Sequence, residues 1–344
     1  MAYISFQPSD HFNTKLYSGT GSSNAITGVG FQPDWVWIKN RSGVASHALM
    51  DAVRGNNKSL RSNTTGAEYT NTYFTSFDSD GFTLTSSETD VNASSTNYAS
   101  WNWLANGSGS ANTDGSISST VSANTTAGFS IVKWTGTGAN ATIGHGLGSV
   151  PKFIITKRYS TTGDWVTYSE ALGNGKYIIL NSTDAEATGS TFWNSTTPTS
   201  SVFSVGTANG TNQSGQTFIG YCFAEKKGFS KFGSYTGNGS TDGAFIYTGF
   251  RPAFFMWKAS STTGGWYTID NKRSDYNPSD KLLGANDSAA ESAFGYNYDH
   301  DFLSNGIKTR YGSFDMNQSG VTYIYMAFAE HPLVSSNDIP AVAR

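Results

Sequence analysis

The chain carries one sequence pattern three times, and this repetition constrains its fold more than any other feature. Each copy starts with an aromatic residue, a Ser or Thr and then Gly-x-Gly. A proline follows 14 or 15 residues after the first of these glycines, and the sixth residue after each proline is lysine. The segments between proline and lysine read DWVWIK (34–39), KFIITK (152–157) and AFFMWK (253–258). Three matches of this kind indicate tandem duplication.

An eleven-residue block without gaps follows in each copy. It reads KSLRSNTTGAE (58–68), KYIILNSTDAE (176–186) and KLLGANDSAAE (281–291), with Lys, Asn, Ala and Glu in the same places. Because the final Glu recurs in fixed register with the Lys and the Asn, we interpret the block as part of one structural network copied three times. Three separate active sites would not need to keep the whole block.

The alignment divides the chain into three units of about 100 residues each. Units two and three are joined by Lys227 and Gly228, whereas a segment rich in Gly, Ser, Asn and Thr separates units one and two. We interpret that segment as an extended connector. Polar and apolar residues alternate within 116–122, so an extra strand there is the alternative. The predicted parts are an N-terminal arm (1–11), a first unit (12–105), the connector (106–127), a second unit (128–227), a third unit (228–332) and a C-terminal arm (333–344).

Composition indicates β-structure in every unit. Charged residues make up only 14% of the chain and aromatic residues another 14%, with 38 glycines, whereas helical proteins carry more Lys, Glu, Leu and Ala. Asn-Gly and Asp-Gly pairs supply the positive φ that hairpin turns between short strands need. We therefore predict an all-β fold of three tandem, jelly-roll-like β-sandwich repeats.

The two tryptophans of the 34–39 segment are predicted to be core residues. Alternate residues face opposite sides of a strand, and both sets are apolar here and in the other two copies, which indicates a central strand covered on both faces or one that packs against a neighbouring unit. Trp37 is replaced by aliphatic residues in those copies, which disfavours a ring platform for a ligand. The lysine that ends each segment, Lys39 in the first, is expected either to extend to the surface or to pair with an acid of its unit, such as Asp51 or Asp270.

Charge and titratable residues exclude several classes of function. The net charge is −3 without a basic run, which disfavours nucleic acid as a partner, and no apolar stretch reaches membrane-spanning length. The five histidines do not repeat between units, and the single cysteine, Cys222, is expected to be a buried thiol. The Asp-rich strings around Asp80 and His300 are interpreted as turns rather than metal sites. We predict no enzyme activity, no cofactor, no metal and no insertion into a membrane.

Binding residues are sought in the segment after each block, where the three copies differ most. Aromatic side chains on variable loops of a rigid sandwich are typical of contacts to sugars or proteins. An aromatic residue occurs there in every copy, so the alternative is that these rings cover the ends of the sandwiches. The candidate ligand-binding residues are Tyr73, Phe74, Phe192, Trp193, Tyr296 and Tyr298.

Several strings resemble a repeat family found in structural proteins of marine tailed bacteriophages. They are GFQPDWVWIKNRS, SANTTAGFSIVKWTGTG, IGHGLGSVPKFIITK, GFSKFGSYTGNGSTDG and TYIYMAFAE. The resemblance covers essentially the whole chain, and it implies a component of the virion, either like a tail fibre or at the capsid surface. The resemblance does not define any functional residues for this chain.

The expected function is therefore that of a non-enzymatic virion structural protein, tail-associated and in contact with the host surface as a fibre-like or receptor-binding protein. A capsid-surface decoration or particle-joining protein is the alternative, and a polysaccharide depolymerase is a third, against which stands the lack of recurring paired acids. The expected partners are other virion proteins, further copies of the chain in a trimer or higher oligomer, and a host surface glycan or outer-membrane protein. Assembly is expected in the host cytoplasm.

Overall fold

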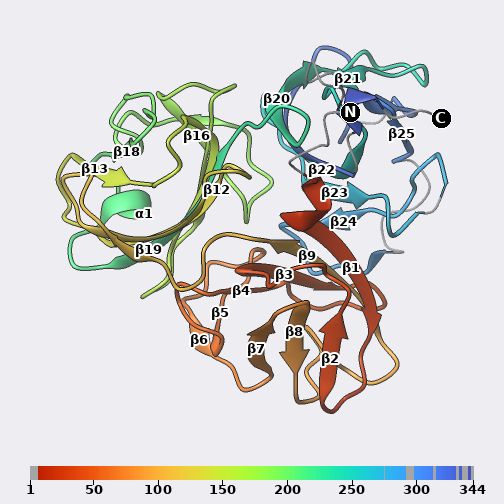
Figure 1. Cartoon of the computed structure of the whole chain (residues 1–344). Helices are drawn as coiled ribbons and strands as arrows, with labels where there is room; N and C mark the ends of the chain where they lie inside the picture. Colours follow the sequence, from red (N-terminus) through yellow and green to blue (C-terminus); the bar gives the residue numbers. More distant parts are fainter. Residues whose placement is uncertain are drawn as a thin grey trace.

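The computed structural model of the chain describes residues 7–274, 276–291, 298–312, 315–330, 333–334 and 340–341. Within these residues the secondary structure is β-strand apart from the helical turns η1 (Pro8–Asp10) and α1 (Asn209–Asn212), so the predicted all-β class is confirmed. Figure 1 shows three lobes that surround a common centre. Most of the two terminal arms predicted from the sequence lies outside the described residues.

The first lobe is a β-sandwich of a principal sheet and a smaller sheet. The principal sheet has the order β1 (Phe12–Ser18), β9 (Asn97–Trp103), β3 (Trp35–Asn40) and β4 (Ala48–Asp51). The smaller sheet consists of β2 (Asn24–Thr27), β8 (Gly81–Leu84) and β7 (Phe74–Asp78), and a separate short pair is formed by β5 (Lys58–Ser59) and β6 (Tyr69–Thr70).

The second lobe has the widest sheet. Its order is β10 (Ser110–Asn112), β11 (Ser119–Asn124), β12 (Phe129–Thr135), β19 (Thr217–Ala224), β14 (Pro151–Arg158), β15 (Trp165–Ser169), β16 (Lys176–Ile179) and β17 (Ala187–Thr188). The smaller sheet pairs β13 (Ala141–Gly144) with β18 (Val202–Val205). Strands β10 and β11 come from the segment that was interpreted as a connector, so the alternative of extra strand structure there is the one observed.

The third lobe repeats the two-sheet arrangement. Its principal sheet has the order β20 (Ser230–Thr236), β27 (Thr322–Ala329), β22 (Pro252–Ala259), β23 (Trp266–Asp270) and β24 (Leu283–Gly284). The smaller sheet consists of β21 (Phe245–Tyr247), β26 (Gly306–Thr309) and β25 (His300–Leu303). Beyond it, β28 (Leu333–Val334) pairs with β29 (Pro340–Ala341).

The three principal sheets share one strand order, which is β1-β9-β3-β4, β12-β19-β14-β15 and β20-β27-β22-β23. The register is also shared, because Trp35 lies opposite Trp103 as Phe153 lies opposite Phe223 and Phe254 opposite Phe328. Residues at the same register position are called equivalent below.

Each principal sheet is buried on both faces. In β3, Val36 and Ile38 face the smaller sheet and belong to the first lobe's own core, whereas Trp35 and Trp37 face the centre of the molecule. All six residues of β3 are buried, which confirms the prediction of a core strand covered on two sides. The rings of Trp35 and Tyr221, from different lobes, stack with their centroids 4.1 Å apart.

The shared core closes around three equivalent rings, one from each lobe. The Trp103 centroid lies 6.5 Å from that of Phe223 and 5.8 Å from that of Phe328, and those two are 5.9 Å apart. Because each ring contacts both others at nearly equal distance, the lobes form a closed ring around an approximate threefold axis. These separations are within the range of favourable edge-to-face and tilted aromatic contacts.

A prediction concerns the removal of one of the three axial rings. Phe223→Ala should lower the free energy of unfolding by about 3–5 kcal/mol, because the cavity would lie in a core that all three lobes share. Urea unfolding followed by tryptophan fluorescence should still show a single transition. The control is Val44→Ala, since Val44 is 73% exposed and should change stability by less than about 0.5 kcal/mol. Separate transitions for the lobes would contradict the shared core.

Candidate functional site

The eleven-residue blocks lie at the boundaries between lobes, where each contacts the next lobe. The block 58–68 contacts the second lobe, 176–186 the third, and 281–291 the first. These boundaries are called the first, second and third joints. The predicted structural network therefore holds lobes together rather than bracing each unit alone.

Two backbone positions of the block are used in the same way at every joint. The amide of the final Glu donates a hydrogen bond to a carbonyl two residues beyond the neighbour's strand lysine. The eighth residue of the block accepts a hydrogen bond from that lysine. The amide bonds are Glu68 to Tyr159, Glu186 to Ser260 and Glu291 to Arg41, at 2.8, 2.8 and 3.1 Å. The lysine bonds are Lys157 Nζ to Thr65 O, Lys258 Nζ to Thr183 O and Lys39 Nζ to Ser288 O, at 2.9, 3.2 and 3.2 Å.

The environment of these lysines corrects the prediction made for them. Lys39, Lys157 and Lys258 have no exposed surface, and the hydrogen-bond acceptors of their ammonium groups are backbone carbonyls rather than an acid of their own unit. Burial lowers the pKa of each to about 8. The sequence could not reveal this because each lysine also bonds to a carbonyl of another lobe, 75 to 249 positions away in the chain.

A ring nitrogen forms a third recurring bond to the fourth residue of the block. Trp165 Nε1 donates to Arg61 O, and Trp266 Nε1 donates to Ile179 O, both at 2.9 Å. At the third joint the equivalent residue is His47, whose Nε2 lies 2.8 Å from Gly284 O.

The tautomer of His47 follows from its two partners. The indole Nε1–H of Trp37 donates to His47 Nδ1 at 2.7 Å, so that nitrogen accepts and the ring proton must lie on Nε2, which faces the Gly284 carbonyl. Burial, and secondarily the charge of Lys39, lower the pKa of His47 to about 3.

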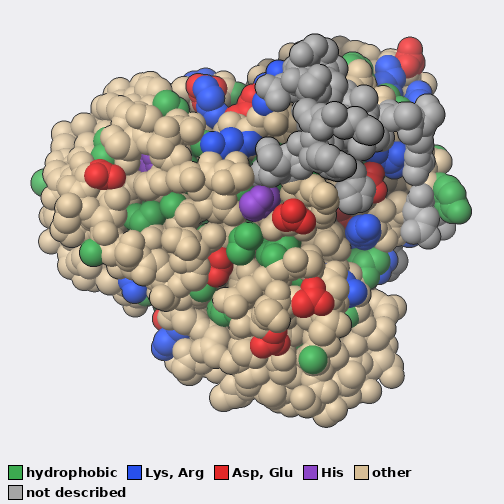
Figure 2. Space-filling view, in the orientation of Figure 1, with side chains coloured by type: hydrophobic (Ala, Val, Ile, Leu, Met, Phe, Trp, Pro, Cys, Tyr) green, Lys and Arg blue, Asp and Glu red, His purple; other side chains and the backbone are tan. Residues whose placement is uncertain are grey.

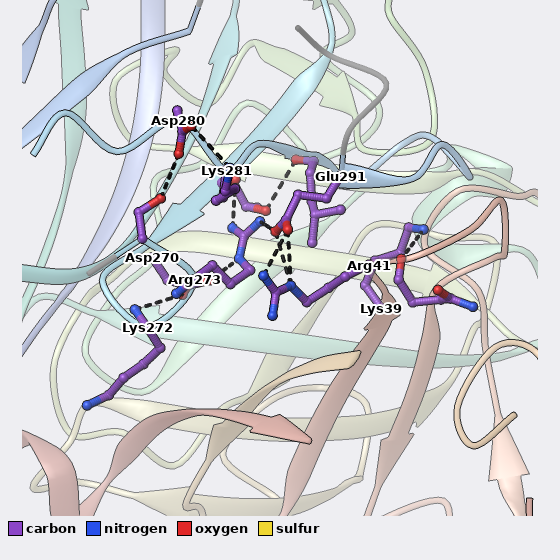
Figure 3. Close-up of polar contacts among 12 residues, drawn as sticks. Lys39, Arg41, Asp270, Lys272, Arg273, Asp280, Lys281 and Glu291 are labelled. Atoms are coloured by element: carbon purple, nitrogen blue, oxygen red, sulfur yellow. Dashed lines mark hydrogen bonds and ion pairs between the residues drawn. The ribbon is translucent and has the colours of Figure 1, made fainter. Parts of the chain in front are cut away.

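The third joint also carries a buried charge cluster, shown in Figure 3. Arg273 donates from Nε to Asp270 at 2.5 Å and from Nη1 to Glu291 at 3.1 Å. Arg41 approaches Glu291 from the first lobe, with Nη2 2.9 Å from the carboxylate. Trp101, also from the first lobe, donates its Nε1–H to Asp270 at 3.1 Å. The cluster therefore consists of residues from both lobes.

The first joint has a similar cluster, in which Tyr221 replaces the Trp101 ring and Tyr159 stands at the position of Arg41. Arg54 binds Asp51 at 2.5 Å and Glu68 at 3.2 Å, and the Tyr221 hydroxyl of the second lobe donates to Asp51 at 2.8 Å. Arg54 and Asp51 are buried, so each carries a charge that depends on the other for compensation.

The second joint lacks this cluster. Ser169 is equivalent to Asp51 and Asp270, Leu172 takes the arginine's place, and Met326 is equivalent to the ring donors Tyr221 and Trp101. Acid, base and donor are thus replaced together. A joint that kept only the acid or only the arginine would bury an unpaired charge, which is strongly destabilising.

The loop aromatics predicted to bind a ligand mostly face inward. Tyr73, Phe74 and Trp193 are buried in the cores of their lobes, which closes them to a stacking ligand in this structure. Phe192 is partly buried and stacks on Tyr177 with centroids 3.8 Å apart. These positions match the alternative that such rings cover the ends of the sandwiches.

The remaining two predicted residues belong to the third lobe. Tyr298 is partly buried, and its hydroxyl donates to Asp315 at 2.8 Å. Tyr296 lies outside the described residues. Any binding by this pair stays a prediction.

The other candidates for chemistry have structural partners. Asp80 accepts hydrogen bonds from the amides of Gly28 and Gly30, as a turn residue does. His300 is buried in β25, with Nδ1 2.7 Å from Tyr298 O. Cys222 is a free buried thiol whose pKa is raised by burial. Among the described residues no group of three or more His, Cys, Asp or Glu side chains is placed to hold a metal.

The surface carries one feature that was not predicted from the sequence. Two rings of β21, Phe245 and Tyr247, are exposed, and a cavity of about 240 Å³ lies beside Tyr247. The signal was present in the alignment of the three copies, because the equivalent pairs are Ala25 with Thr27 and Thr142 with Gly144 in the other lobes. Charged side chains on the face in Figure 2 are scattered rather than gathered into one patch.

Comparison with known families adds one finding. A model of the family described as "Domain of unknown function (DUF7483)" matches residues 7–332. The comparisons with curated proteins and with solved structures found no match. In the described part of the chain, no helix has the length and apolar character to cross a membrane.

A second prediction concerns acid sensitivity of the third joint. Below pH 6.5 an unfolded His47 binds a proton, whereas the folded ring stays neutral down to about pH 3. The buried neutral ring of His47 therefore stabilises the fold fully above pH 6.5. Below that pH the free energy of unfolding should fall by about 1.4 kcal/mol per pH unit. His47→Gln, which keeps a donor and an acceptor, should flatten that slope in urea unfolding measured at pH 7.5, 5.5 and 4.5. Equal slopes for both proteins would contradict the assignment.

A third prediction uses the second joint as a template for the first. Arg54→Leu alone should cost about 3–5 kcal/mol, because it removes the buried ion-pair partner of Asp51. Adding Asp51→Ser and Tyr221→Met reproduces the residues of the second joint and should recover much of that loss. Unfolding free energies of the single and triple variants test this. A triple variant less stable than Arg54→Leu would show that the three side chains are not coupled.

Proposed function

The chain belongs to the DUF7483 family, and we propose that it is a non-enzymatic structural protein of a bacteriophage particle, associated with the tail and in contact with the host surface. The observation that carries the proposal is the closed ring of lobes around Trp103, Phe223 and Phe328. A ring whose lobes are each held by two joints and a common core is a rigid body. Rigidity of this kind suits a mechanical or display role.

The proposed organisation is three tandem, jelly-roll-like β-sandwich repeats, covering residues 12–105, 128–227 and 228–332. The shared strand order and the repeated joint contacts support it. The sequence strings that resemble structural proteins of marine tailed phages support the assignment to a particle. Residues 1–11 and 333–344 would then be arms, and segment 106–127 would add strands β10 and β11 to the principal sheet of the second repeat.

The joints fit a protein that is stabilised without covalent crosslinks. The chain has one cysteine and so no disulfide within it, and its stability must come from burial and hydrogen bonding. Such a protein can fold in the reducing host cytoplasm and remain folded after release of the particle. Its proposed partners are other particle proteins, further copies of the chain, and a glycan or outer-membrane protein of the host.

A second candidate function is decoration of the capsid surface. The approximate threefold axis of the single chain favours it, because such a body could fit a local threefold position of a capsid lattice. This role would be purely structural, and the exposed surface would then contact other chains of the particle rather than the host.

Labelling of intact particles tests the proposed location. An antibody against the purified chain, seen by immunogold electron microscopy, should label the tail of phage particles that contain the protein. The same antibody should reduce adsorption of these particles to host cells, with an antibody to the major capsid protein as the control. Labelling over the capsid would favour the second candidate. If mass spectrometry of purified particles does not detect the chain, both candidate functions are excluded.

A further inference from the structure

Two aromatic rings of the third lobe project from the outer face of its smaller sheet. Phe245 is 46% exposed and Tyr247 is 63% exposed, while Ile246 between them is buried in the core of the lobe. Residues two apart in a strand face the same side, so the two rings share one surface. Strand β21 is the edge strand of its sheet, which leaves this pair at the rim of the lobe.

Both rings lie along the surface rather than extending from it. A Cβ on Gly306 would come within 2.9 Å of the Phe245 ring, and one on Gly249 within 3.5 Å of the Tyr247 hydroxyl. Gly306 therefore leaves room for the Phe245 ring to lie over the backbone, whereas the contact at Gly249 is an ordinary one that a side chain could also make. The result is a shelf, formed by Phe245 and Tyr247, with ring surface open to solvent.

A cavity with both polar and apolar lining adjoins the shelf. Its volume is about 240 Å³, and Tyr247 forms one wall together with the turn at 248–249, while the link between lobes two and three, residues 225–231, forms the other. Glu225 and Lys231 line it as an ion pair with 2.8 Å between carboxylate and ammonium. Lys227 also lines the cavity and is exposed, so the cavity offers donors and acceptors together with one positive charge at its edge that is unpaired among the described residues.

The framework of the fold does not require these rings. The equivalent positions hold Ala25 and Thr27 in the first lobe, and Thr142 and Gly144 in the second. The first lobe forms the same edge strand without such rings, whereas in the second lobe the segment around Ile117 lies against this strand. An exposed aromatic costs solubility without adding to the core, so its presence in one lobe alone points to contact with another molecule.

We propose that the shelf of Phe245 and Tyr247 and the adjoining cavity bind an uncharged saccharide. The exposed ring surface suits the apolar C–H face of a pyranose, and the paired Glu225 and Lys231 can hydrogen-bond its hydroxyl groups. A strongly anionic ligand would call for several unpaired cations, whereas Lys231 here and Lys308 on the same face are each paired with a carboxylate and, of these three described lysines, Lys227 alone is unpaired. The cavity is smaller than the roughly 300–1,000 Å³ of typical drug-sized sites, which suits one or two sugar residues.

The source of the saccharide rests on the proposed function, since a host-contacting particle protein would meet the polysaccharide of a bacterial surface. One shallow site binds weakly, and several copies of the chain on one particle would raise the avidity. The closed arrangement of the three lobes keeps the shelf in a fixed orientation relative to the rest of the protein.

The test uses the full chain on an array of uncharged and acidic oligosaccharides from bacterial surfaces, followed by titration of the retained saccharides in solution. Phe245→Ala combined with Tyr247→Thr copies the first lobe and should weaken binding of the uncharged saccharides by about tenfold or more. The melting temperature should not change, because both rings are exposed. The matched control is Tyr276→Thr, which removes a tyrosine that is 85% exposed and does not line the cavity.

Retention of uncharged saccharides that is lost in the double variant and kept in the control supports the inference. No retained saccharide, retention of acidic ones only, or binding that the double variant leaves unchanged would overturn it. These results are separate from particle labelling. A labelled tail without saccharide binding overturns this inference alone, and saccharide binding by a chain that no particle contains overturns the proposed function alone.

Discussion

The structure depends on burial of the outward faces of three principal sheets. A sandwich normally buries one face of each sheet and leaves the other to solvent. Here those second faces carry large rings such as Trp35, Trp103 and Phe254, all of which lie in the shared core. Full burial of a large apolar side chain stabilises a protein by about 1.5–3 kcal/mol, and a separated lobe would lose the part of this that the other two lobes supply. The lobes are therefore not independent domains in an energetic sense.

The joints give this apolar core a defined arrangement. Apolar contacts are not directional, and three sheets could meet in several ways. The block of each lobe makes hydrogen bonds to the sheet of the next, through a buried lysine, a ring nitrogen and a backbone amide. The contact is head-to-tail, and it closes after three steps because the lobes are related by about a third of a turn.

Much of the fold could be predicted from the sequence because its signals are local. Alternation of apolar residues, turn glycines and the threefold repetition are sufficient for the all-β class and for the burial of Trp35 and Trp37. The role of the block could not be predicted in this way. Lys39 and Ser288 meet across 249 positions of the chain, and nothing near either residue shows which carbonyl accepts the bond.

The candidate site was predicted less well, for a physical reason. An aromatic residue in a variable loop can bind a ligand or cover a core, and sequence type does not distinguish these, as Trp193 shows. Comparison of equivalent positions does distinguish them, because residues needed for the fold recur. Phe245 and Tyr247 do not recur in the other two lobes.

The third joint differs from the others in one respect, since the chain does not pass directly from one of its lobes to the other. It is also the joint where Arg41 and Trp101 of the first lobe bind Glu291 and Asp270 of the third. A head-to-tail contact without a covalent link could equally join two molecules and propagate into a filament. Closure within one chain benefits from the high effective concentration of tethered partners. The side chains differ between the three joints, so each block is complementary to the sheet of one particular lobe. The order of the lobes around the axis is therefore specified by charge as well as by connectivity.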